Sequence, residues 1–300
     1  MIHVPEELAA SQAKYNGAAG RAFVAALPGL AADFLDRWGL RLTGPPMHGV
    51  ASLVLPVDRD GGTPAALKLQ LLDEESEGEP VGLRVWDGDG AVRLLDHDPE
   101  TGTMLLERAD ETRHLSRLGD ERAAVRILAG LLARLSARPA PPGLRTLGAT
   151  AAAMLGAAPG AAARLGAADA ALLTDCAAAV REVAAEPGDR LLHWDLHYDN
   201  ILGADREPWL AIDPKPLAGD PGFELLPALT DLWNPDPAAI RWRFDLLAEH
   251  LGLDRDRALA WTLGRVLQNG LWDVEDAVEA GEEPRLDAHQ VVIARALMAR

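Results

Sequence analysis

Three polar residues in one short segment have the types and the spacing that phosphoryl transfer needs. Asp195 is followed five positions later by Asn200, and Asp213 closes the segment. A carboxylate can orient the proton of an attacking hydroxyl, while an amide oxygen and a second carboxylate can hold Mg²⁺ against nucleotide phosphates. Single Asp and Asn residues in polar loops are usually turn formers, but that interpretation does not explain the order and spacing of all three. We therefore interpret Asp195 as catalytic and Asn200 and Asp213 as metal ligands.

Two short strands are predicted to bring these side chains together. The apolar runs 201–202 and 209–212 flank a turn-like segment, 203–208. Strands joined by a tight turn hold their ends close to each other. Asp195, Asn200 and Asp213 can therefore converge at one end of a hairpin.

The same segment carries a family resemblance. The pattern H-x-D-x-x-x-x-N, followed by an aspartate after a short strand, resembles the catalytic segment of the protein-kinase-like fold. The forms HWDLH at 193–197 and IDPK at 212–215 resemble the aminoglycoside phosphotransferase family, in particular its streptomycin 6-kinase-like group of aminoglycoside/hydroxyurea resistance kinases. The resemblance covers roughly residues 45–275 and is specific in the catalytic segment.

The resemblance implies an α+β, bilobal protein-kinase-like fold, with a small antiparallel β-sheet in the N-lobe and a mainly helical C-lobe. Residues 1–107 would form the nucleotide-binding lobe with extra N-terminal helices, and residues 108–300 the helical catalytic and substrate-binding lobe. A length of 300 residues suits two domains. The implied cofactors are ATP and Mg²⁺. The implied reaction moves the γ-phosphate of ATP, bound between the lobes, to a hydroxyl of a small molecule, most simply an aminoglycoside such as streptomycin.

Lys68 is the predicted phosphate-binding lysine. It lies in ALKL, on a strand that returns from the hairpin signal DRDGGT at 58–63, and this resembles the strand lysine that contacts the α- and β-phosphates. An exposed strand lysine is the plainer alternative. Leu67 and Leu69 would share the buried face and leave Lys68 on the other. No GxGxxG loop precedes it, so backbone amides near Ser52 would have to cradle the phosphates.

The acidic partner of Lys68 is expected in the segment 73–86. Glu79 has the family's spacing to a leucine and a tryptophan, but Pro80 follows it directly. Because proline is tolerated in a first helical turn and disfavours helix in the residue before it, we predict a helix that begins at Pro80 with Glu79 at its cap. Glu75 or Glu77 could substitute as the partner.

The adenine site is predicted from position alone. The segment LLER at 105–108 resembles the family's hinge, so the Glu107 carbonyl and the Ala109 amide would pair with the base.

Acidic and aromatic residues are candidates for the acceptor site, because carboxylates and aromatic faces attract ammonium and guanidinium groups. Helix tryptophans that pack in the core and acids that coat the outside are the alternative. The candidates are Trp194, Lys215, Asp231, Trp272, Asp273, Glu275 and Asp276. Trp194, Asp199 and Pro216 stand where this branch usually has glycine, so the resemblance supports ATP better than it supports streptomycin.

Charge and composition exclude several classes. A net charge of −17 disfavours nucleic acid and anionic membranes as partners. It fits a cationic small molecule as partner and, equally well, a surface whose charge serves solubility alone. The single cysteine excludes an intrachain disulfide. The first residues lack a basic region followed by an apolar run, so we expect a cytoplasmic enzyme, as a monomer or homodimer.

Two other functions stay open. One is a small-molecule kinase for an amino sugar, a sugar or a choline-like alcohol. The other is a non-catalytic nucleotide-binding pseudokinase, which the presence of Lys68, Asp195, Asn200 and Asp213 argues against.

The remaining chain is predicted mostly from periodicity. Residues 5–40 read as helix with a break at Pro28-Gly29, and 90–107 as two strands. From Arg113 onward we expect helices, apart from the catalytic segment and its flanks.

Overall fold

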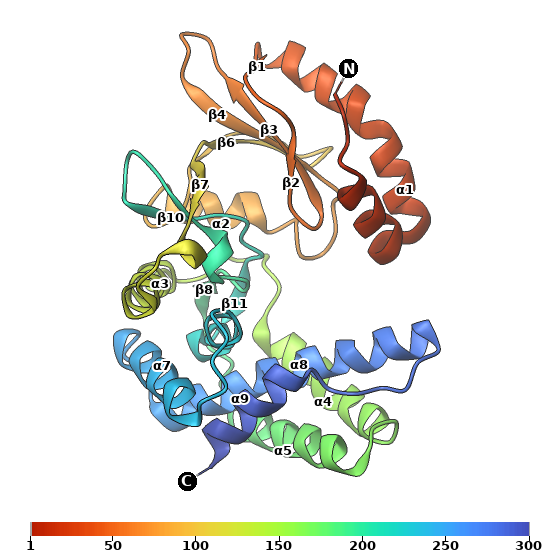
Figure 1. Ribbon diagram of the computed structural model, residues 1–300, viewed down its shortest axis with the longest axis vertical. Helices are drawn as coiled ribbons and strands as arrows, with labels where there is room; N and C mark the ends of the chain where they lie inside the picture. Colours follow the sequence, from red (N-terminus) through yellow and green to blue (C-terminus); the bar gives the residue numbers. More distant parts are fainter. Residues whose placement is uncertain (1, 300) are drawn as a thin grey trace. The chain divides into compact units, whose positions relative to one another are not determined.

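The structure, a computed structural model, describes residues 2–299, which divide into two units. Unit 1 comprises Met1–Asp110 with Ala204–Arg206, and unit 2 comprises Glu111–Gly203 with Glu207–Arg300. Figure 1 shows unit 1 as a sheet with helices α1 and α2, and unit 2 as most of the helices with a few short strands.

Unit 1 is built on an antiparallel sheet with the strand order β1-β3-β4-β6-β5. Strand β2 pairs with the N-terminal part of β3. The predicted hairpin is confirmed, because Asp58 pairs with Pro64 and the turn between them contains Gly61 and Gly62 at φ 84° and 81°. Such positive φ angles suit glycine. The strands are β1 (Arg41–Leu42), β2 (Met47–His48), β3 (Ser52–Asp58), β4 (Pro64–Gln70), β5 (Leu94–Asp98) and β6 (Thr103–Glu107).

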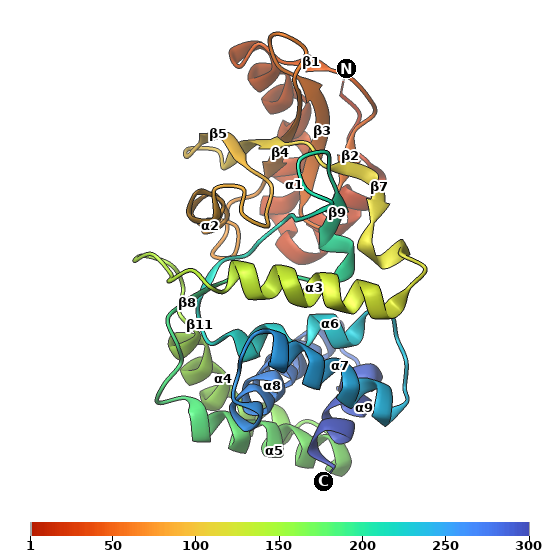
Figure 2. The ribbon, with the colours of Figure 1, turned by 90° about the vertical axis from the view of Figure 1, so that its left-hand side faces the viewer.

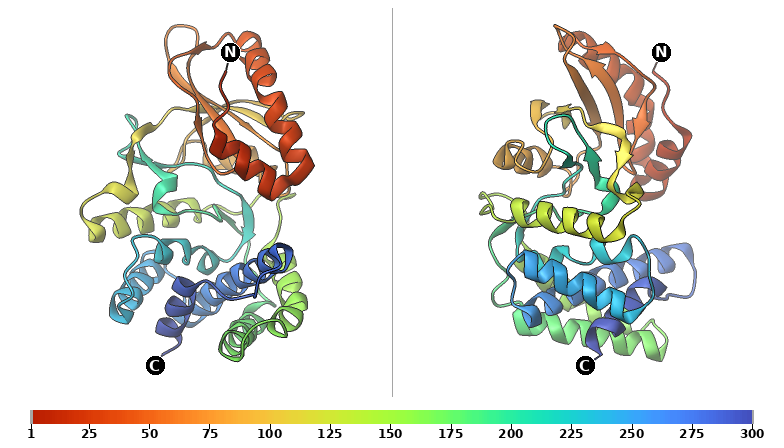
Figure 3. Two further views of the ribbon diagram at one scale, coloured as in Figure 1. Left: turned by 45° about the vertical axis from the view of Figure 1, so that its right-hand side comes forward. Right: turned by 60° about the vertical axis from the view of Figure 1, so that its left-hand side comes forward.

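Helix α1 (Glu6–Arg37) lies along this sheet, as the red helix of Figure 3 shows. The predicted break at Pro28-Gly29 is wrong, since the helix continues through Pro28 and is kinked at Gly17, with φ 53° and ψ −123°. Proline removes one helical hydrogen bond but has a helical φ, whereas the angles of Gly17 lie outside the helical region. By length and composition α1 could also span a membrane, but in this structure its apolar side chains join the core of unit 1.

Helix α2 (Glu79–Trp86) begins one residue earlier than predicted, so Glu79 belongs to its first turn and Gly78 occupies the cap position. Proline at the second helical position is compatible with this start, because the first N–H groups of a helix have no intrahelical partner. Leu83 and Trp86 are 1% exposed and fix the inner face of the helix.

Two small sheets carry the catalytic segment. β9 (Ile201–Gly203) pairs with β10 (Trp209–Ala211), and β9 also adjoins β7 (Asp110–His114); β8 (Arg190–Leu192) pairs with β11 (Leu217–Gly219). The prediction of helix from Arg113 is wrong at its start, because Arg113 lies in β7. This strand has the polar sequence DETRH, which gives no apolar alternation to recognise.

Unit 2 is otherwise helical (Figure 2). α4, α5 and α8 pack on one another, and Cys176 is buried in α5. The elements are α3 (Glu121–Leu135), α4 (Leu147–Ala162), α5 (Ala167–Val183), α6 (Pro227–Thr230), α7 (Pro237–His250), α8 (Arg255–Ala280), α9 (Ala288–Met298), and the short 3-10 helices η1 (Leu115–Arg117), η2 (Tyr198–Asn200) and η3 (Pro221–Glu224).

Candidate active site

His193 holds the loop that follows β8. The ring is fully buried, with Nε2 3.0 Å from the Ile212 carbonyl, and the Asp195 amide donates to Nδ1 at 3.4 Å. Burial lowers the pKa of His193 to about 4, so the ring is neutral at pH 7. A neutral ring with Nε2–H as donor and Nδ1 as acceptor satisfies both contacts, so His193 ties the loop to Ile212, the residue that follows β10.

Asp195 is partly accessible and lies beside a cation. Its carboxylate is 3.4 Å from Lys215 Nζ, and its side chain is 26% exposed. Burial tends to raise the pKa of Asp195, but the charges of Lys215 and Arg265 outweigh it and leave the pKa below its ordinary value. The group is therefore an ionised carboxylate at neutral pH, able to accept a hydrogen bond from a hydroxyl.

The hairpin brings Asn200 and Asp213 to the same place. Asn200 Nδ2 donates to the Asp195 carbonyl at 2.9 Å, and the Ile212 amide donates to the Asn200 carbonyl at 2.9 Å. β9 and β10 are in register up to the pair Ile201–Ala211, so Asp213 leaves the hairpin next to Asn200. Asp213 itself adopts φ 57°, a left-handed backbone conformation. The predicted hairpin is confirmed, and it places Asn200 beside Asp195 and close to Asp213; the roles of the three groups stay predictions.

Trp194 lies behind this site and not at its surface. Its side chain is 1% exposed, and its ring lies 4.8 Å from the Arg145 guanidinium, 4.6 Å from that of Arg265 and 5.3 Å from the Phe223 ring. The predicted contact with the acceptor is therefore not what the structure shows. Residue 194 does need an unusual backbone, with φ 73°, which explains why glycine is an acceptable residue here.

Unit 1 contains Lys68, the lysine predicted to bind the phosphates of the nucleotide. Lys68 Nζ lies 2.7 and 2.6 Å from the two carboxylate oxygens of Glu79, and Gln70 Nε2 donates to Glu79 Oε2 at 3.0 Å. Lys68 and Glu79 are 3% and 1% exposed. Lys68 is thus buried and paired, which excludes the alternative of an exposed strand lysine, and Glu79 rather than Glu75 or Glu77 is its partner.

The other predicted nucleotide residues lie at the ends of inner strands of the same sheet or just beyond them. Ser52 is the first residue of β3 and follows the exposed loop 49–51. Glu107 ends β6, and its carboxylate is held by Arg206 at 2.9 and 3.0 Å. Ala109 follows two residues later, before β7. Contacts of Ser52, Glu107 and Ala109 with a nucleotide stay predictions.

A cavity of about 410 Å³ opens next to Asp195 within unit 2. Asp231, predicted for the acceptor site, is in its wall. Trp272, Asp273, Glu275 and Asp276 are all in the described chain, but none of them lines the cavity; Asp273 instead accepts the Asp287 amide at 2.9 Å. The lining consists of Asp195, His197, Leu226, Pro227, Thr230, Asp231, Arg265, Asn269, Asp287, His289 and Gln290.

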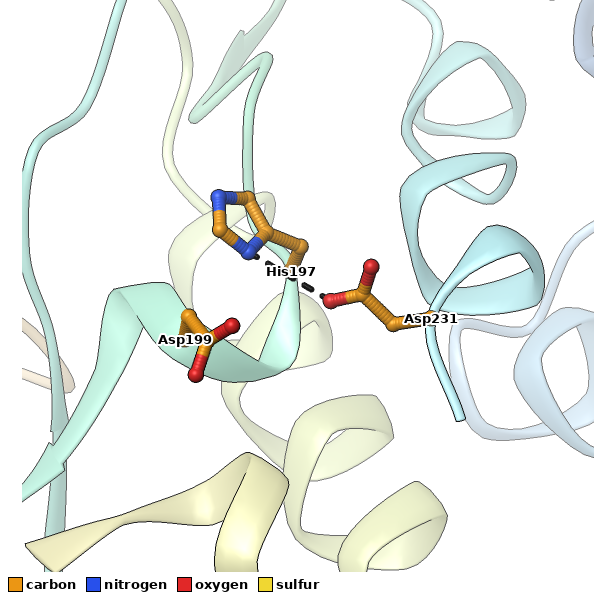
Figure 4. Close-up of side chains that lie close together, drawn as sticks. All are labelled: His197, Asp199 and Asp231. Atoms are coloured by element: carbon orange, nitrogen blue, oxygen red, sulfur yellow. Dashed lines mark ion pairs between the residues drawn. The ribbon is translucent and has the colours of Figure 1, made fainter. Parts of the chain in front are cut away.

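His197, Asp199 and Asp231 form a cluster at this cavity (Figure 4). Their ligand-type atoms lie within 4.8 Å of one another. Protein groups already bind all three, since His197 Nδ1 lies 3.4 Å from Asp231, the Tyr198 amide donates to Asp231 at 3.2 Å, and Ser116 donates to Asp199. Burial alone would lower the pKa of His197. The hydrogen bond to Asp231 and the nearby carboxylates have the larger effect, so the pKa lies above its ordinary value. We interpret the cluster as an ion pair in the cavity wall.

Sequence reasoning missed several cavity residues on α8 and α9. Arg265 and Asn269 are spaced by one helical turn within the mostly buried segment of α8 between Ala258 and Gly270. Polar residues four apart in an apolar helix share one face, and that pattern could have identified them. The sequence has no comparable signal for Asp287, His289 and Gln290.

Comparisons with known proteins agree with this geometry. Residues 37–277 match the aminoglycoside/hydroxyurea antibiotic resistance kinase family. A hydroxyurea phosphotransferase from Kitasatospora aureofaciens is 60% identical over 299 residues, covering 99% of this chain and 87% of that protein. A streptomycin 6-kinase from Streptomyces glaucescens is 56% identical over 304 residues, covering 99% of this chain and 97% of that protein.

The fold also resembles solved structures. One is a thermostable mutant of an aminoglycoside phosphotransferase in a ternary complex with ADP and hygromycin B. The two structures superpose with a TM-score of 0.57 and are 15% identical in sequence. The match covers 90% of this chain and 99% of the other. At this identity the likeness concerns the fold alone, and it confirms the predicted protein-kinase-like class.

Proposed function

Because the chain belongs to the aminoglycoside/hydroxyurea antibiotic resistance kinase family, we propose that it transfers the γ-phosphate of ATP to a hydroxyl of streptomycin. The chain is an O-phosphotransferase that acts on a small molecule. The observation that carries the proposal is Asp195, an ionised carboxylate at the wall of a polar cavity of about 410 Å³, next to Asn200 and Asp213. The kinase for another small alcohol and the pseudokinase are not favoured, because streptomycin kinases match this chain over nearly its whole length.

The proposed roles divide between the two units. In unit 1, Lys68 holds the α- and β-phosphates of ATP, the backbone near Ser52 cradles them, and the Glu107 carbonyl and Ala109 amide bind the adenine. Glu79 keeps Lys68 in its orientation through a bidentate contact. Residues 1–107 are thus the proposed nucleotide-binding lobe, and residues 108–300 the proposed catalytic lobe.

In unit 2, Asn200 and Asp213 are the proposed ligands of Mg²⁺. An amide oxygen and a carboxylate fit this ion, which prefers hard oxygen ligands and keeps several waters. Asn200 uses Nδ2 to bind the Asp195 carbonyl, and this contact fixes the amide so that Oδ1 is its ligand atom. Bound Mg²⁺ supplies charge neutralisation at the phosphates.

Asp195 orients the acceptor in this proposal. Its low pKa makes it a weak base, but phosphoryl transfer passes through a loose transition state in which positioning counts more than early proton removal. Lys215, 3.4 Å from the carboxylate, keeps it ionised and supplies a positive charge beside the reacting hydroxyl. The ion pair of His197 with Asp231 and the polar side chains of Asn269 and Gln290 then face the rest of the acceptor.

Hydroxyurea is a second candidate acceptor, because the hydroxyurea phosphotransferase from Kitasatospora aureofaciens is 60% identical to this chain. It also presents a hydroxyl to Asp195. A cavity of about 410 Å³ with charged walls favours the larger acceptor, since hydroxyurea is no bigger than an amino-acid side chain and would contact few of these groups. A cytoplasmic, monomeric or homodimeric enzyme remains our proposal.

The test is ATP consumption with Mg²⁺ and each of three acceptors, namely streptomycin, hydroxyurea and choline. Wild type and Asp195→Asn are run in parallel, with Asp189→Asn as the control, because the Asp189 side chain is 91% exposed and lies outside the catalytic set. We expect turnover on streptomycin, a loss of about 10³-fold in Asp195→Asn and little change in the control. Product analysis by ³¹P NMR identifies the hydroxyl, which the relative's name suggests is at position 6. Turnover on hydroxyurea alone would replace the substrate, and turnover on none of the three would refute the proposal.

A further inference from the structure

Side chains of α1 donate hydrogen bonds to the loop that precedes β3. This loop, residues 49–51, joins β2 to β3, and its tip residue Val50 is 71% exposed. Ser11 Oγ donates to the Val50 carbonyl at 2.7 Å, and Gln12 Nε2 donates to the Ala51 carbonyl at 2.9 Å. Two consecutive carbonyls of the loop are therefore turned toward the helix.

The orientation of these two carbonyls fixes the orientation of two amides. In a trans peptide, the C=O of one residue and the N–H of the next point in opposite directions, and none of the described peptide bonds is cis. Because the Val50 carbonyl faces α1, the Ala51 N–H faces away from it, and the Ala51 carbonyl likewise turns the Ser52 N–H away. Successive N–H groups that point the same way form a concave site for anionic oxygens.

Gln12 is held firmly enough to set this geometry. Its side chain belongs to a residue that is 1% exposed, and its Oε1 accepts from Asn16 Nδ2 at 3.0 Å, which fixes the amide with Nε2 toward the loop. Leu8, one turn earlier on the same face, is fully buried in the core with Leu53 and Leu69. The helix face that carries Ser11 and Gln12 is thus anchored to the sheet.

The kink of α1 has a part in this arrangement. After Gly17, the helix returns so close to its first part that a Cβ on Gly20 would lie 2.1 Å from the Gln12 carbonyl oxygen. Only glycine fits such an approach without a backbone shift. The second half of α1 therefore supports the turn from which Gln12 reaches the loop.

The strand that leaves the loop leads to the buried lysine. Ser52 is in register with Gln70, which donates to Glu79, and Val54 is in register with Lys68. A shift of the loop would thus move the amides relative to the ammonium group of Lys68. We propose that Ser11 and Gln12 are positioning residues that aim the Ala51 and Ser52 amides at the phosphates of the nucleotide, an inference that rests on the proposed function.

The test compares a ligand that has phosphates with one that lacks them. Binding of ADP and of adenosine is measured by titration calorimetry for wild type, Gln12→Leu, Ser11→Ala, Ser11→Thr and Glu7→Ala. We expect Gln12→Leu to weaken ADP about tenfold, the equivalent of one buried hydrogen-bonded contact, and to leave adenosine within about twofold. Ser11→Ala should weaken the binding of ADP less than Gln12→Leu does. Ser11→Thr, which keeps the hydroxyl, should bind like wild type, as should Glu7→Ala on the exposed side of α1.

The outcomes separate the inference from the proposed function. Equal weakening of ADP and adenosine would indicate a general loss of structure and overturn the inference, as would unchanged ADP binding in Gln12→Leu. Unfolding midpoints of all variants show whether each one folds. If wild type does not bind ADP at all, the proposed function itself fails. In turnover assays the inference expects a higher KM for ATP in Gln12→Leu with a nearly unchanged kcat at saturating ATP.

Discussion

The backbone amide of Trp194 donates a hydrogen bond to Glu224 Oε1 at 2.5 Å, so the residue before Asp195 is tied to a carboxyl group in the interior of unit 2. Glu224 is 1% exposed, and its other oxygen, Oε2, has no hydrogen-bond partner among the described residues. A lone oxygen in such a place favours the protonated form.

Glu224 is therefore expected to make stability depend on pH. Burial raises the pKa of Glu224 from 4.5 to about 7, although the amides of Trp194 and His193 and the charge of Arg265 lower it. The folded protein binds this proton more tightly than the unfolded chain, so its contribution is present below pH 4.5 and is lost as pH rises through about 7. The loss amounts to about 3 kcal/mol of the free energy of unfolding.

Glu224→Gln should remove this dependence, because its amide oxygen still accepts from Trp194 but does not titrate. Urea unfolding at several pH values between about 5 and 8 measures the difference. We expect the wild type to lose about 2.5 kcal/mol relative to Glu224→Gln over that range, since part of the change lies below pH 5. Glu249→Gln, at an exposed glutamate, is the control that should follow the wild type. Parallel curves for wild type and Glu224→Gln would contradict the assignment.

Trp194 tests whether packing or backbone strain decides the stability of the catalytic loop. At φ 73°, glycine would relieve a strain of about 1 kcal/mol, but the substitution removes a buried ring between Arg145 and Arg265. Deleting a buried aromatic side chain costs about 3–5 kcal/mol, so the packing effect is larger. Trp194→Gly should lower the free energy of unfolding by about 3 kcal/mol, and Trp194→Phe by clearly less. A glycine variant as stable as wild type in urea would show that strain dominates.

The catalytic hairpin was predictable because its signals are local. Turn residues between two apolar runs fix the pairing of β9 with β10, and this pairing alone brings Asn200 next to Asp213. The β3–β4 hairpin follows in the same way from its glycines. The partner of Lys68 was harder to predict, because Pro80 made the helix start ambiguous and Glu79 lies eleven residues from the lysine.

The residues that the sequence did not identify depend on contacts between distant segments. Trp194 is a predicted acceptor residue because aromatic faces attract cationic groups, but the cations on its ring are Arg145, from the loop before α4, and Arg265, from α8. The predicted break at Pro28-Gly29 rests on proline, the stronger local signal, whereas the structure kinks α1 at Gly17. After the kink, Gly20 lies so close to Gln12 that a Cβ would not fit there, a contact that local sequence signals do not show.

Variants of the buried pair of Lys68 and Glu79 should show different effects on the free energy of unfolding and on ATP turnover. Glu79→Leu leaves a buried ammonium group without its partner, and breaking a buried ion pair in this way costs about 3–5 kcal/mol. The double variant Lys68→Met with Glu79→Leu removes both charges and should regain most of that stability, while ATP turnover stays lost. Denaturant unfolding and the turnover assay are the two measurements. Glu77→Leu, at the exposed glutamate that was the alternative partner, should change neither. A double variant as unstable as Glu79→Leu would mean that the charge pair is not the reason for the loss.

Asp213 should control the dependence of activity on Mg²⁺. Asp213→Asn suits the test because asparagine tolerates the left-handed backbone at φ 57° and keeps the shape of the side chain while it removes the charge. A neutral oxygen binds Mg²⁺ less well than a carboxylate, so we expect the half-saturating Mg²⁺ concentration to rise about tenfold, with the unfolding midpoint unchanged. Chelation of the metal should stop turnover in both proteins. Asp189→Asn is the matched control, because it makes the same chemical change at a carboxylate that is 91% exposed. If Asp213→Asn needed no more Mg²⁺ than wild type, the carboxylate would not be a ligand, and Asn200 alone could not account for a metal site at the end of this hairpin.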